Sequence, residues 1–273
     1  VCYLNESFAS KMAITSTRDF INHNKSFLTQ TQFLNTRQID SSNINLLEFW
    51  NCGCQLVSIN FQSSKKLMDI YHSWFKKNGS CGYVLKPDFL RDHYFYLNLK
   101  QKDLISHIDP LNIRLKIISG QHLPMPKGSS SKTIFMDPYV TVQVLGVPID
   151  CAECRTKTVS NELNSPQFNE IFEFNIKIPE LALIRFTVLD DEYILDDFIG
   201  QYTAPVDCIQ PGYRHIPLFA QNGEVIENAS LFVHISFTYR CTSKARRRKK
   251  KFWNSRFHAL IKQTGFKQID EIF

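Results

Sequence analysis

The sequence has no hydrophobic run long enough to cross a membrane. Its best candidate, Leu181–Leu189, is short and interrupted by Arg185, whereas a spanning helix needs about 20 apolar residues. The first residue is Val1, with neither an initiating Met nor a basic segment leading into an apolar stretch. We therefore expect no secretory signal, and we expect the chain to be part of a longer one.

Recognisable catalytic and metal-binding motifs are also missing. The eight cysteines include two close pairs, Cys52-x-Cys54 and Cys151-x-x-Cys154, but neither has a second pair at zinc-site spacing. The sequence contains no Gly-x-Ser-x-Gly, no Gly-x-x-x-x-Gly-Lys and no Gly-x-Gly-x-x-Gly. These absences exclude the common hydrolase elbow and nucleotide-binding loops, and they favour reduced thiols in a cytosolic protein.

Positive charge is concentrated at one end of the chain. Residues Arg240–Phe273 hold eleven Lys or Arg against two acids, a net charge of +9, so the rest of the chain carries −3 of the total +6. Six cations are consecutive: Arg246, Arg247, Arg248, Lys249, Lys250 and Lys251.

After this run, Trp253, Phe257, Leu260 and Ile261 recur at helical spacing. We interpret residues 240–273 as a basic, amphipathic helical tail that binds an anionic membrane. A nuclear-import signal and solvated disorder are the alternatives. Since no RNA-binding motif with interleaved aromatics is present, we expect no nucleic-acid partner.

Hydrophobic periodicity divides the remaining chain into two parts of different fold class. Within residues 1–100, helix-compatible stretches alternate with apolar runs at Gln55–Phe61 and Gly82–Pro87, which predicts an α/β part with buried parallel strands. Residues 101–111 are interpreted as a linker. Residues 112–239 are predicted to be an all-β sandwich. Its predicted strands are Ile113–Ile118, Tyr139–Leu145, Ile171–Ile176, Leu183–Leu189 and Leu231–Phe237.

Several motifs occur in a fixed order in the first part. They are Asp40–Asn43, Glu48–Asn51, Gly53–Val57, Asn60–Gln62 and Asn78–Arg91. In this order they closely resemble the Y half of eukaryotic phosphoinositide-specific phospholipases C. A second set resembles the C2 domain that follows the barrel in that family: Ile117–Pro124, Asp137-Pro138, Pro179–Phe186, Asp197–Gln201 and Gly212–His215. Within the family, Asp150–Val159 and Val188–Ile194 look most like the eta class.

The resemblance implies that the first part is the C-terminal half of a TIM-like (β/α)₈ barrel. A complete barrel takes about 250 residues, so the upstream X half is expected in the same or a companion chain. In the family, that half supplies the two catalytic histidines and the ligands of the catalytic calcium. This chain alone should therefore be inactive, and no residue in it is assigned as catalytic.

The Y half of the family contributes to binding the substrate headgroup. Ser7 matches a family serine, but the Arg-x-Tyr-Pro motif is lost. Counting back from Asp40 places Thr31 and Phe33 at the Arg and Tyr positions, whereas aligning on Leu28-Thr29 places Gln30 and Gln32 there. Neither register supplies a guanidinium that could grip a phosphate, and Arg37 lies six or seven residues late.

Two hypotheses follow from this loss. In the first, the whole protein hydrolyses phosphatidylinositol 4,5-bisphosphate to diacylglycerol and inositol trisphosphate in intracellular signalling. In the second, it is a catalytically inactive adaptor that binds membranes through its C2 domain and tail. Both predict a cytoplasmic protein, peripheral at a phosphoinositide-containing plasma membrane, and the basic run leaves the nucleus possible.

The resemblance also implies a calcium site in the loops of the C2 domain. The family positions fall on Asp137, Asn161, Asp190, Glu192 and Asp197, with Asp196 beside the last. Calcium takes about six to eight oxygen ligands, and several carboxylates from converging loops suit it. The alternative is that these acids are solvated loop residues.

Overall fold

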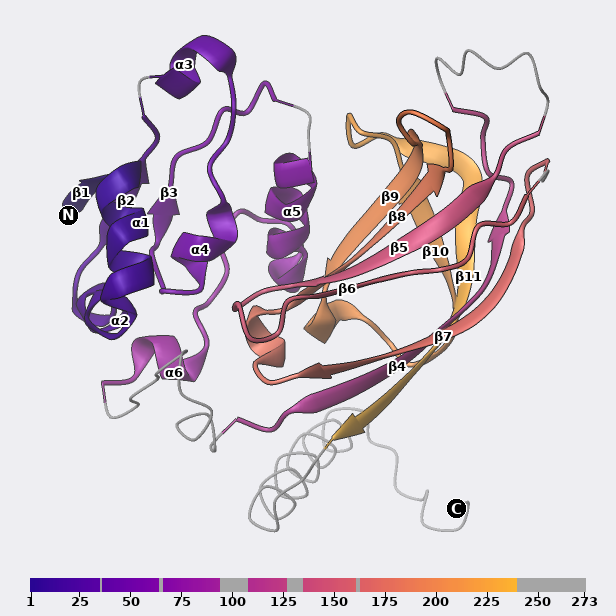
Figure 1. The fold of residues 1–273 in the computed structure, drawn as a ribbon. Helices are drawn as coiled ribbons and strands as arrows, with labels where there is room; N and C mark the ends of the chain where they lie inside the picture. The colour runs from indigo at the N-terminus through magenta and orange to yellow at the C-terminus, as the bar shows by residue number, and fades with distance from the viewer. Residues whose placement is uncertain (35, 64–65, 94–107, 127–134, 161–162, 240–273) are drawn as a thin grey trace, which may run out of the picture. The chain divides into compact units, whose positions relative to one another are not determined.

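The structure is a computed structural model that describes residues 1–34, 36–63, 66–93, 108–126, 135–160 and 163–239 (Figure 1). Residues Val1–Thr238 form one compact unit, and Tyr239–Phe273 form a second. The predicted tail, with its cationic run 246–251, lies outside the described residues, as does most of the predicted linker. In the described part of the chain, no helix has both the length and the apolar character needed to cross a membrane.

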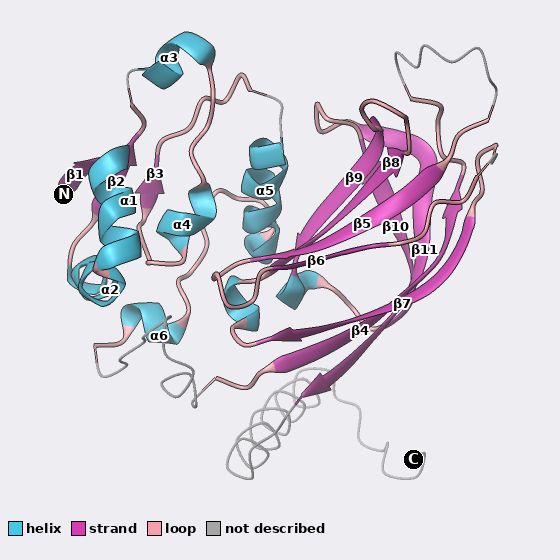
Figure 2. Cartoon of the chain, viewed as in Figure 1, coloured by secondary structure: helices cyan, strands magenta, loops and turns pink. Residues whose placement is uncertain are grey.

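Residues 1–93 form a small α/β part that carries all the described α-helices (Figure 2). Its elements are β1 (Cys2–Asn5), α1 (Glu6–Thr15), α2 (Thr17–Ser26), β2 (Thr29–Gln32), α3 (Thr36–Asp40), α4 (Leu46–Trp50), β3 (Leu56–Val57), α5 (Lys66–Phe75), η1 (Lys76–Asn78) and α6 (Asp88–Arg91). The three strands form a parallel sheet in the order β1-β2-β3. Helix α1 begins directly after β1, where the side chain of Asn5 accepts a hydrogen bond from Phe8 N at 2.8 Å. The predicted α/β class is confirmed.

One predicted strand of this part does not form. Residues Gly82–Pro87 have no assigned strand, and the strand predicted over Gln55–Phe61 shortens to Leu56–Val57. An extended segment becomes a strand only when a neighbour accepts and donates its backbone hydrogen bonds. No such neighbour lies beside residues 82–87 in the described part of the chain.

The rest of the compact unit is an eight-stranded antiparallel β-sandwich. Its strands are β4 (Leu111–Gln121), β5 (Pro138–Leu145), β6 (Ala152–Arg155), β7 (Gln167–Ile176), β8 (Leu183–Asp190), β9 (Asp197–Pro205), β10 (Gly212–Phe219) and β11 (Val225–Tyr239), and two short 3₁₀ turns are η3 (Pro179–Leu181) and η4 (Val206–Cys208). The strand order is β6-β5-β8-β9-β10-β11-β4-β7. Since β9 and β10 pair only at Gln201–Phe219, two four-stranded layers face each other.

Alternation of apolar and polar residues explains the sandwich core. Along β4 the side chains of Leu111, Ile113, Leu115 and Ile117 are buried, while the residues between them face outward. They pack in one cluster with the inward side chains of β5, β8 and β11, such as Val142 and Phe186. All five sandwich strands predicted from the sequence are confirmed, whereas β6, β9 and β10 were not predicted.

The α/β part and the sandwich share a second hydrophobic cluster. Phe49, Trp50 and Trp74 pack in it together with the sandwich residues Ile178 and Leu181. At the same junction, Ser73 Oγ donates to Thr203 O at 2.8 Å and Asn51 Nδ2 donates to Gly146 O at 2.9 Å. The two parts therefore form one folded unit and are not independent domains joined by a linker.

A buried ion pair lies at the centre of this junction, where α5 contacts β8 and β9 (Figure 1). Arg185 Nε is 3.5 Å from Asp69 Oδ2, and the two side chains are only 9% and 15% exposed. Arg185 Nη2 also donates to Gln201 Oε1 at 2.7 Å, and Thr203 Oγ1 donates to Asp69 Oδ2 at 2.5 Å. Burial lowers the pKa of Arg185, and the negative charge of Asp69 opposes that shift.

Replacing Asp69 by Ala should destabilise the whole compact unit. The change leaves the Arg185 guanidinium buried without its counter-ion, which costs about 3–5 kcal/mol. Urea unfolding followed by circular dichroism would measure the loss. The matched control is Glu173→Ala, which removes the exposed Arg114–Glu173 pair and should cost less than about 1 kcal/mol. Equal losses in the two variants would contradict the importance of the buried pair.

Candidate functional site

Strand β2 presents different side chains to the two faces of the small sheet. Thr29 and Thr31 are fully buried, where Thr29 Oγ1 donates to Asn24 Oδ1 at 2.7 Å and Thr31 Oγ1 donates to Leu56 O at 3.4 Å. Gln30 and Gln32 alternate with them and face the opposite side. On that side Gln30 pairs in register with Tyr3 and Leu56, which are 64% and 45% exposed. This row marks the open face of the sheet.

This alternation distinguishes the two registers for the lost Arg-x-Tyr motif. Thr31 faces the buried side, and Phe33 packs half-buried against the hydrophobic cluster. The open face instead receives Gln30 and Gln32. The register counted from Asp40 therefore places its residues away from the open face, and the other register places two neutral amides on it.

Arg37, the cation nearest to this motif in the sequence, is held in a structural ion pair. Its Nε donates to Glu6 Oε2 at 2.7 Å and its Nη2 to Glu6 Oε1 at 2.6 Å, in a bidentate pair. Its Nη1 donates to Ser42 Oγ and Asn43 O. The hydrogen bonds that Arg37 donates to Glu6 are the main reason that the pKa of Arg37 is raised. Sequence reasoning missed this pair, because the two residues are 31 positions apart.

Ser7, the predicted headgroup-binding serine, follows Glu6 in the first turn of α1 and is exposed. Strands β1 and β2 both end beside this place, at Asn5 and Gln32. In parallel barrels, active sites lie at this carboxyl edge of the strands. The edge therefore carries Ser7 and an internally neutralised Arg37–Glu6 pair.

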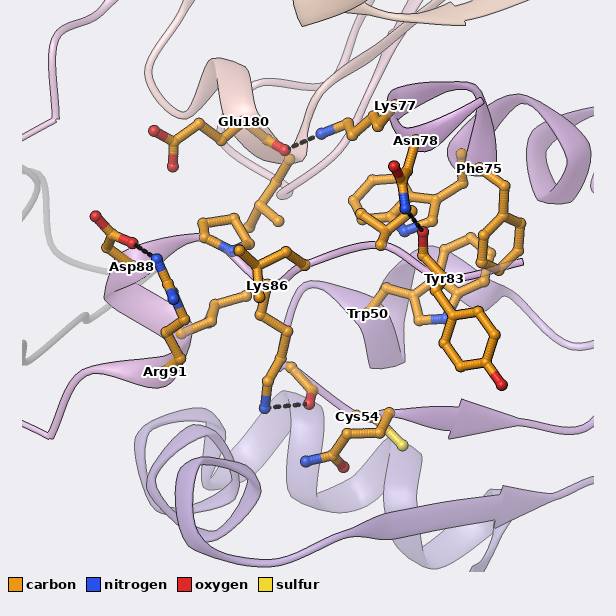
Figure 3. A pocket seen from close by; sticks show the side chains of 18 of the residues that line it. Trp50, Cys54, Phe75, Lys77, Asn78, Tyr83, Lys86, Asp88, Arg91 and Glu180 are labelled. Atoms are coloured by element: carbon orange, nitrogen blue, oxygen red, sulfur yellow. Dashed lines mark hydrogen bonds and ion pairs between the residues drawn. The ribbon is translucent and has the colours of Figure 1, made fainter. Parts of the chain in front are cut away.

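A cavity of about 750 Å³ opens between the α/β part and the turns of the sandwich (Figure 3). Stacked Trp50 and Trp74, with ring centroids 5.1 Å apart, contribute to its wall together with Tyr83. Asn78 Nδ2 donates to Tyr83 O at 3.0 Å and fixes the turn before that residue. The side chain of Tyr83 itself is 80% exposed.

Each cation that lines this cavity already has partners. Lys77 donates to Glu180 O and lies 3.5 Å from Asp207 Oδ2, while Lys86 donates to Asn24 O at 2.7 Å and to Gly53 O at 3.3 Å. Arg91 forms an ion pair with Asp88. A phosphate would have to displace these contacts, so the cavity is not arranged as an anion site.

The predicted calcium ligands lie at one end of the sandwich, and the structure brings three of them together. Asp190 pairs in register with Asp197 on β9 and with Pro138 on β5, and its Oδ1 accepts a hydrogen bond from Asp137 N at 2.6 Å. Burial is the largest cause that raises the pKa of Asp190, followed among the carboxylates by Asp137 and then Asp197. Glu192 is exposed, and Asn161 lies outside the described residues.

The two other acids of these loops are engaged by neighbouring side chains. Asp191 accepts hydrogen bonds from Arg155 Nη2 at 2.7 Å and from Thr158 Oγ1 at 2.5 Å. Asp196 accepts from Tyr139 Oη at 2.6 Å, and burial together with this bond raises the pKa of Tyr139 to about 12. These contacts anchor the loops to the strands.

The loop carboxylates do not form a ready-made metal site in the described residues. No group of three or more His, Cys, Asp or Glu side chains there is arranged to hold a metal ion. Asp137, Asp190 and Asp197 have the right chemistry and are close in register, but a calcium ion would require a further approach of the loops. The calcium site stays a prediction.

Apolar side chains project from the same loops. Tyr193, Ile194 and Leu195 are consecutive and 102%, 85% and 79% exposed. On the neighbouring loops Phe135 is 49% and Leu163 is 54% exposed. Hydrogen bonds from Asp191 N to Asp137 O and from Val159 N to Pro138 O bring the three loops to one end. Tyr193, Ile194 and Leu195 are therefore exposed apolar side chains at the acidic end of the sandwich.

Comparison with known proteins assigns both parts of the compact unit. Residues 1–89 match the family model of the phosphatidylinositol-specific phospholipase C, Y domain, and residues 111–220 match that of the C2 domain. The chain thus contains the Y half of a phospholipase C barrel followed by a C2 sandwich.

Two curated relatives match the chain along its entire length. Inactive phospholipase C-like protein 1 of Homo sapiens is 46% identical over 277 residues, and inactive phospholipase C-like protein 2 of Mus musculus is 47% identical. The match takes up 25% and 24% of these relatives, so the chain spans about a quarter of their length. The crystal structure of PLC21 from L. pealei has a TM-score of 0.77 and 34% identity, covering 88% of this chain and 30% of that one.

Replacing Asp190 by Asn should stabilise the protein at neutral pH when calcium is absent. A carboxyl whose folded-state pKa is raised favours folding when protonated, so its contribution is lost as pH rises above the unfolded value of 3.8. Asn keeps an oxygen for Asp137 N and removes the charge. We expect the melting temperature at pH 7 to rise by about 2 °C, with a smaller difference at pH 3.5.

The control for this prediction is Asp88→Asn, which changes a side chain that is 77% exposed and should leave the melting curves within experimental error. If Asp190→Asn shifted the melting temperature equally at both pH values, its charge would not be the cause.

Proposed function

We propose that the protein is a phospholipase C-like adaptor without hydrolase activity. In this role the Y half is kept as a scaffold, and the C2 domain places the protein peripherally on an anionic, phosphoinositide-containing membrane. The observation that supports the proposal is the open face of β2, which carries the neutral amides Gln30 and Gln32 where one register of the family motif would place Arg and Tyr.

Electrostatics support the loss of hydrolysis. A multiply charged inositol phosphate needs charge-assisted hydrogen bonds, and a guanidinium supplies them in pairs. Gln30 and Gln32 offer none, and Arg37 is neutralised by Glu6. The full-length relatives carry the word inactive in their names, which favours the adaptor over the hydrolase. We accordingly group the chain with these phospholipase C-like proteins and not with the eta class.

The loops of the C2 domain support membrane association. Tyr193, Ile194 and Leu195 could enter the interfacial region of a bilayer, where aromatic and aliphatic side chains are favoured. Calcium bound among Asp137, Asp190 and Asp197 would neutralise the acidic rim and let the loops approach anionic lipid. The cationic run 246–251 would add about 1 kcal/mol per charge near such a surface.

The remaining parts of the proposal concern the whole protein. We infer that an X half covers the open face of the sheet, since Tyr3 and Leu56 are otherwise exposed there. We place the protein at the cytoplasmic side of the plasma membrane. The nucleus, reached by import through residues 246–251, is the second location to examine.

The full-length protein, captured on an antibody to residues 246–273, should not hydrolyse phosphatidylinositol 4,5-bisphosphate at any calcium concentration. Introducing Gln30→Arg together with Gln32→Tyr should raise its affinity for inositol trisphosphate by at least about tenfold, because a charged hydrogen bond contributes about 1.5–3 kcal/mol. Release of inositol trisphosphate from mixed micelles measures hydrolysis, and calorimetry measures the affinity of the double variant for inositol trisphosphate.

Thr31→Arg with Phe33→Tyr is the matched control for the strand register. It buries a guanidinium on the closed side of the sheet, so we expect lower stability and no gain in affinity. Calcium-dependent hydrolysis by the unmodified protein would overturn the adaptor proposal. If Thr31→Arg with Phe33→Tyr raised the affinity for inositol trisphosphate, the register that places Gln30 and Gln32 at the motif positions would be wrong.

Replacing Tyr193, Ile194 and Leu195 by Ser should weaken binding to vesicles of phosphatidylserine and phosphatidylcholine by roughly tenfold or more, since each loses apolar contact with the bilayer. Cosedimentation with and without calcium measures the effect. In addition, Asp137→Asn with Asp190→Asn should abolish any increase that calcium produces.

The matched control replaces Tyr213, Val225 and Ile171 by Ser; these side chains are 66%, 60% and 47% exposed elsewhere on the sandwich. If vesicle binding fell equally in both triple variants, the proposed membrane contact of the loops would be wrong. An unchanged calcium response in the double Asp variant would leave the loop acids structural.

A further inference from the structure

A second cavity, of about 1090 Å³, lies at the opposite end of the sandwich from the acidic loops. Helices α1, α4 and α5 form one side of it, and the turn that follows Leu145 at the end of β5 forms the other. Pro138, beside the acidic loops, is at the start of the same strand. About eight residues of extended strand, or roughly 25 Å, therefore separate the two ends.

The walls of this cavity are mainly aliphatic. Leu47 and Ile70 are buried at its base, and Leu67 and Ile149 are half-buried on its two sides. Ile14 is 59% exposed at its edge. Small-molecule sites in proteins measure about 300–1,000 Å³ and combine apolar walls with a few polar groups. At about 1090 Å³, this cavity is slightly larger than that range.

The mouth of the cavity carries an exposed cation, Lys66. No hydrogen bond or ion pair joins its ammonium to another described residue, and Glu153 is the acid whose charge acts on it. Burial lowers the pKa of Lys66, and the positive charge of Arg185 lowers it further, while Glu153 opposes both. The carboxylate of Glu153 is occupied at 2.6 Å by Gln143 Nε2, and Arg185 is paired with Asp69.

Glu48 and Asn51 are among the other polar side chains that line the cavity. Glu48 Oε1 accepts a hydrogen bond from Ser10 Oγ at 2.5 Å and so is turned toward α1. Asn51 is only 4% exposed, and its Nδ2 donates to Gly146 O, while its Oδ1 has no partner in the described structure. A buried amide oxygen without a donor is unfavourable, and a ligand that displaced the local packing could satisfy it.

We propose that this cavity binds a single-chain anionic amphiphile, with its hydrocarbon chain along Leu67, Ile70 and Ile149 and its carboxylate beside Lys66. Charge complementarity selects the anionic head, and the aliphatic walls select the chain. The ligand is a free amphiphile and not a lipid in the bilayer that the loops would touch, because the cavity lies at the other end of β5. The site does not depend on the proposed membrane association.

The test is calorimetric titration of the full 273-residue chain with oleate below its critical micelle concentration. We expect saturable binding of one oleate per chain. Lys66→Gln removes the cation and Leu67→Trp fills the cavity, and each should weaken binding by about tenfold. Ile14→Trp, at an exposed edge position, serves as a second blocking variant if Leu67→Trp lowers the melting temperature.

Matched controls lie on the far side of the sandwich. Lys116→Gln removes a surface cation of β4, and Ile171→Trp enlarges a 47% exposed side chain of β7. Both should bind oleate like the unmodified chain, and oleyl alcohol, which has no charge, should bind about tenfold more weakly than oleate.

Three results would overturn the proposal. Absence of saturable oleate binding would show that the cavity serves something else, such as binding a helix of a protein partner. An equal loss of oleate binding in the cavity variants (Lys66→Gln and Leu67→Trp) and in the controls would indicate non-specific adsorption. Equal binding of oleate and oleyl alcohol, together with unchanged binding by Lys66→Gln, would remove the anionic head from the assignment.

Discussion

The docking of α5 onto strands β8 and β9 is the contact on which the rest of the compact unit depends. Asp69 and Arg185 leave water on folding, and such a pair is tolerated only when its remaining hydrogen-bonding groups are satisfied. Gln201 accepts from Arg185 Nη2 and Thr203 donates to Asp69, whereas Arg185 Nε is left facing Asp69 without a hydrogen-bond partner in the described structure. Neither part of the chain contains the complete set, so the polar centre of the junction exists only when both parts are folded.

The same junction explains how half of a barrel can be stable. A parallel sheet of three short strands buries too little surface by itself, and its open face has no cover in the described part of the chain. The sandwich supplies Val147, Ile178, Leu181 and Leu183 to the hydrophobic cluster that the helices form. The helical side of the half-barrel is thus completed by the C2 domain, and its open side is left for another segment.

The sequence predicts the parts of the fold whose residues follow a simple period. Strands β4, β5, β7, β8 and β11 alternate apolar and polar side chains or are mostly apolar, and they were predicted. Strand β2 reads Thr-Gln-Thr-Gln and contains no aliphatic residue, so periodicity gives no signal. Its burial depends instead on hydrogen bonds that Thr29 and Thr31 make with distant residues. The strand expected over Gly82–Pro87 fails because pairing is a property of a neighbour and not of the segment itself.

The same difference between local patterns and long-range contacts applies to the residues of the candidate sites. The family motifs predicted acidic residues at neighbouring strand ends, and the strand register places Asp137, Asp190 and Asp197 at one end of the sandwich. The motifs did not show that Tyr139 and Arg155 hold Asp196 and Asp191, nor that Glu6 neutralises Arg37. These contacts join residues 31 to 57 positions apart, and no local pattern encodes such pairs.

Neutralisation of the headgroup edge has a consequence for stability as well as for function. A site that binds a phosphorylated inositol must hold cations close together without counter-ions, and their mutual repulsion and desolvation destabilise the folded protein. Here Gln30 and Gln32 carry no charge, and Arg37 is satisfied by Glu6, Ser42 and Asn43. Under the proposed adaptor role, the chain no longer has to tolerate that repulsion. The paired, neutral edge therefore fits the proposed scaffold better than a site that binds a phosphorylated headgroup.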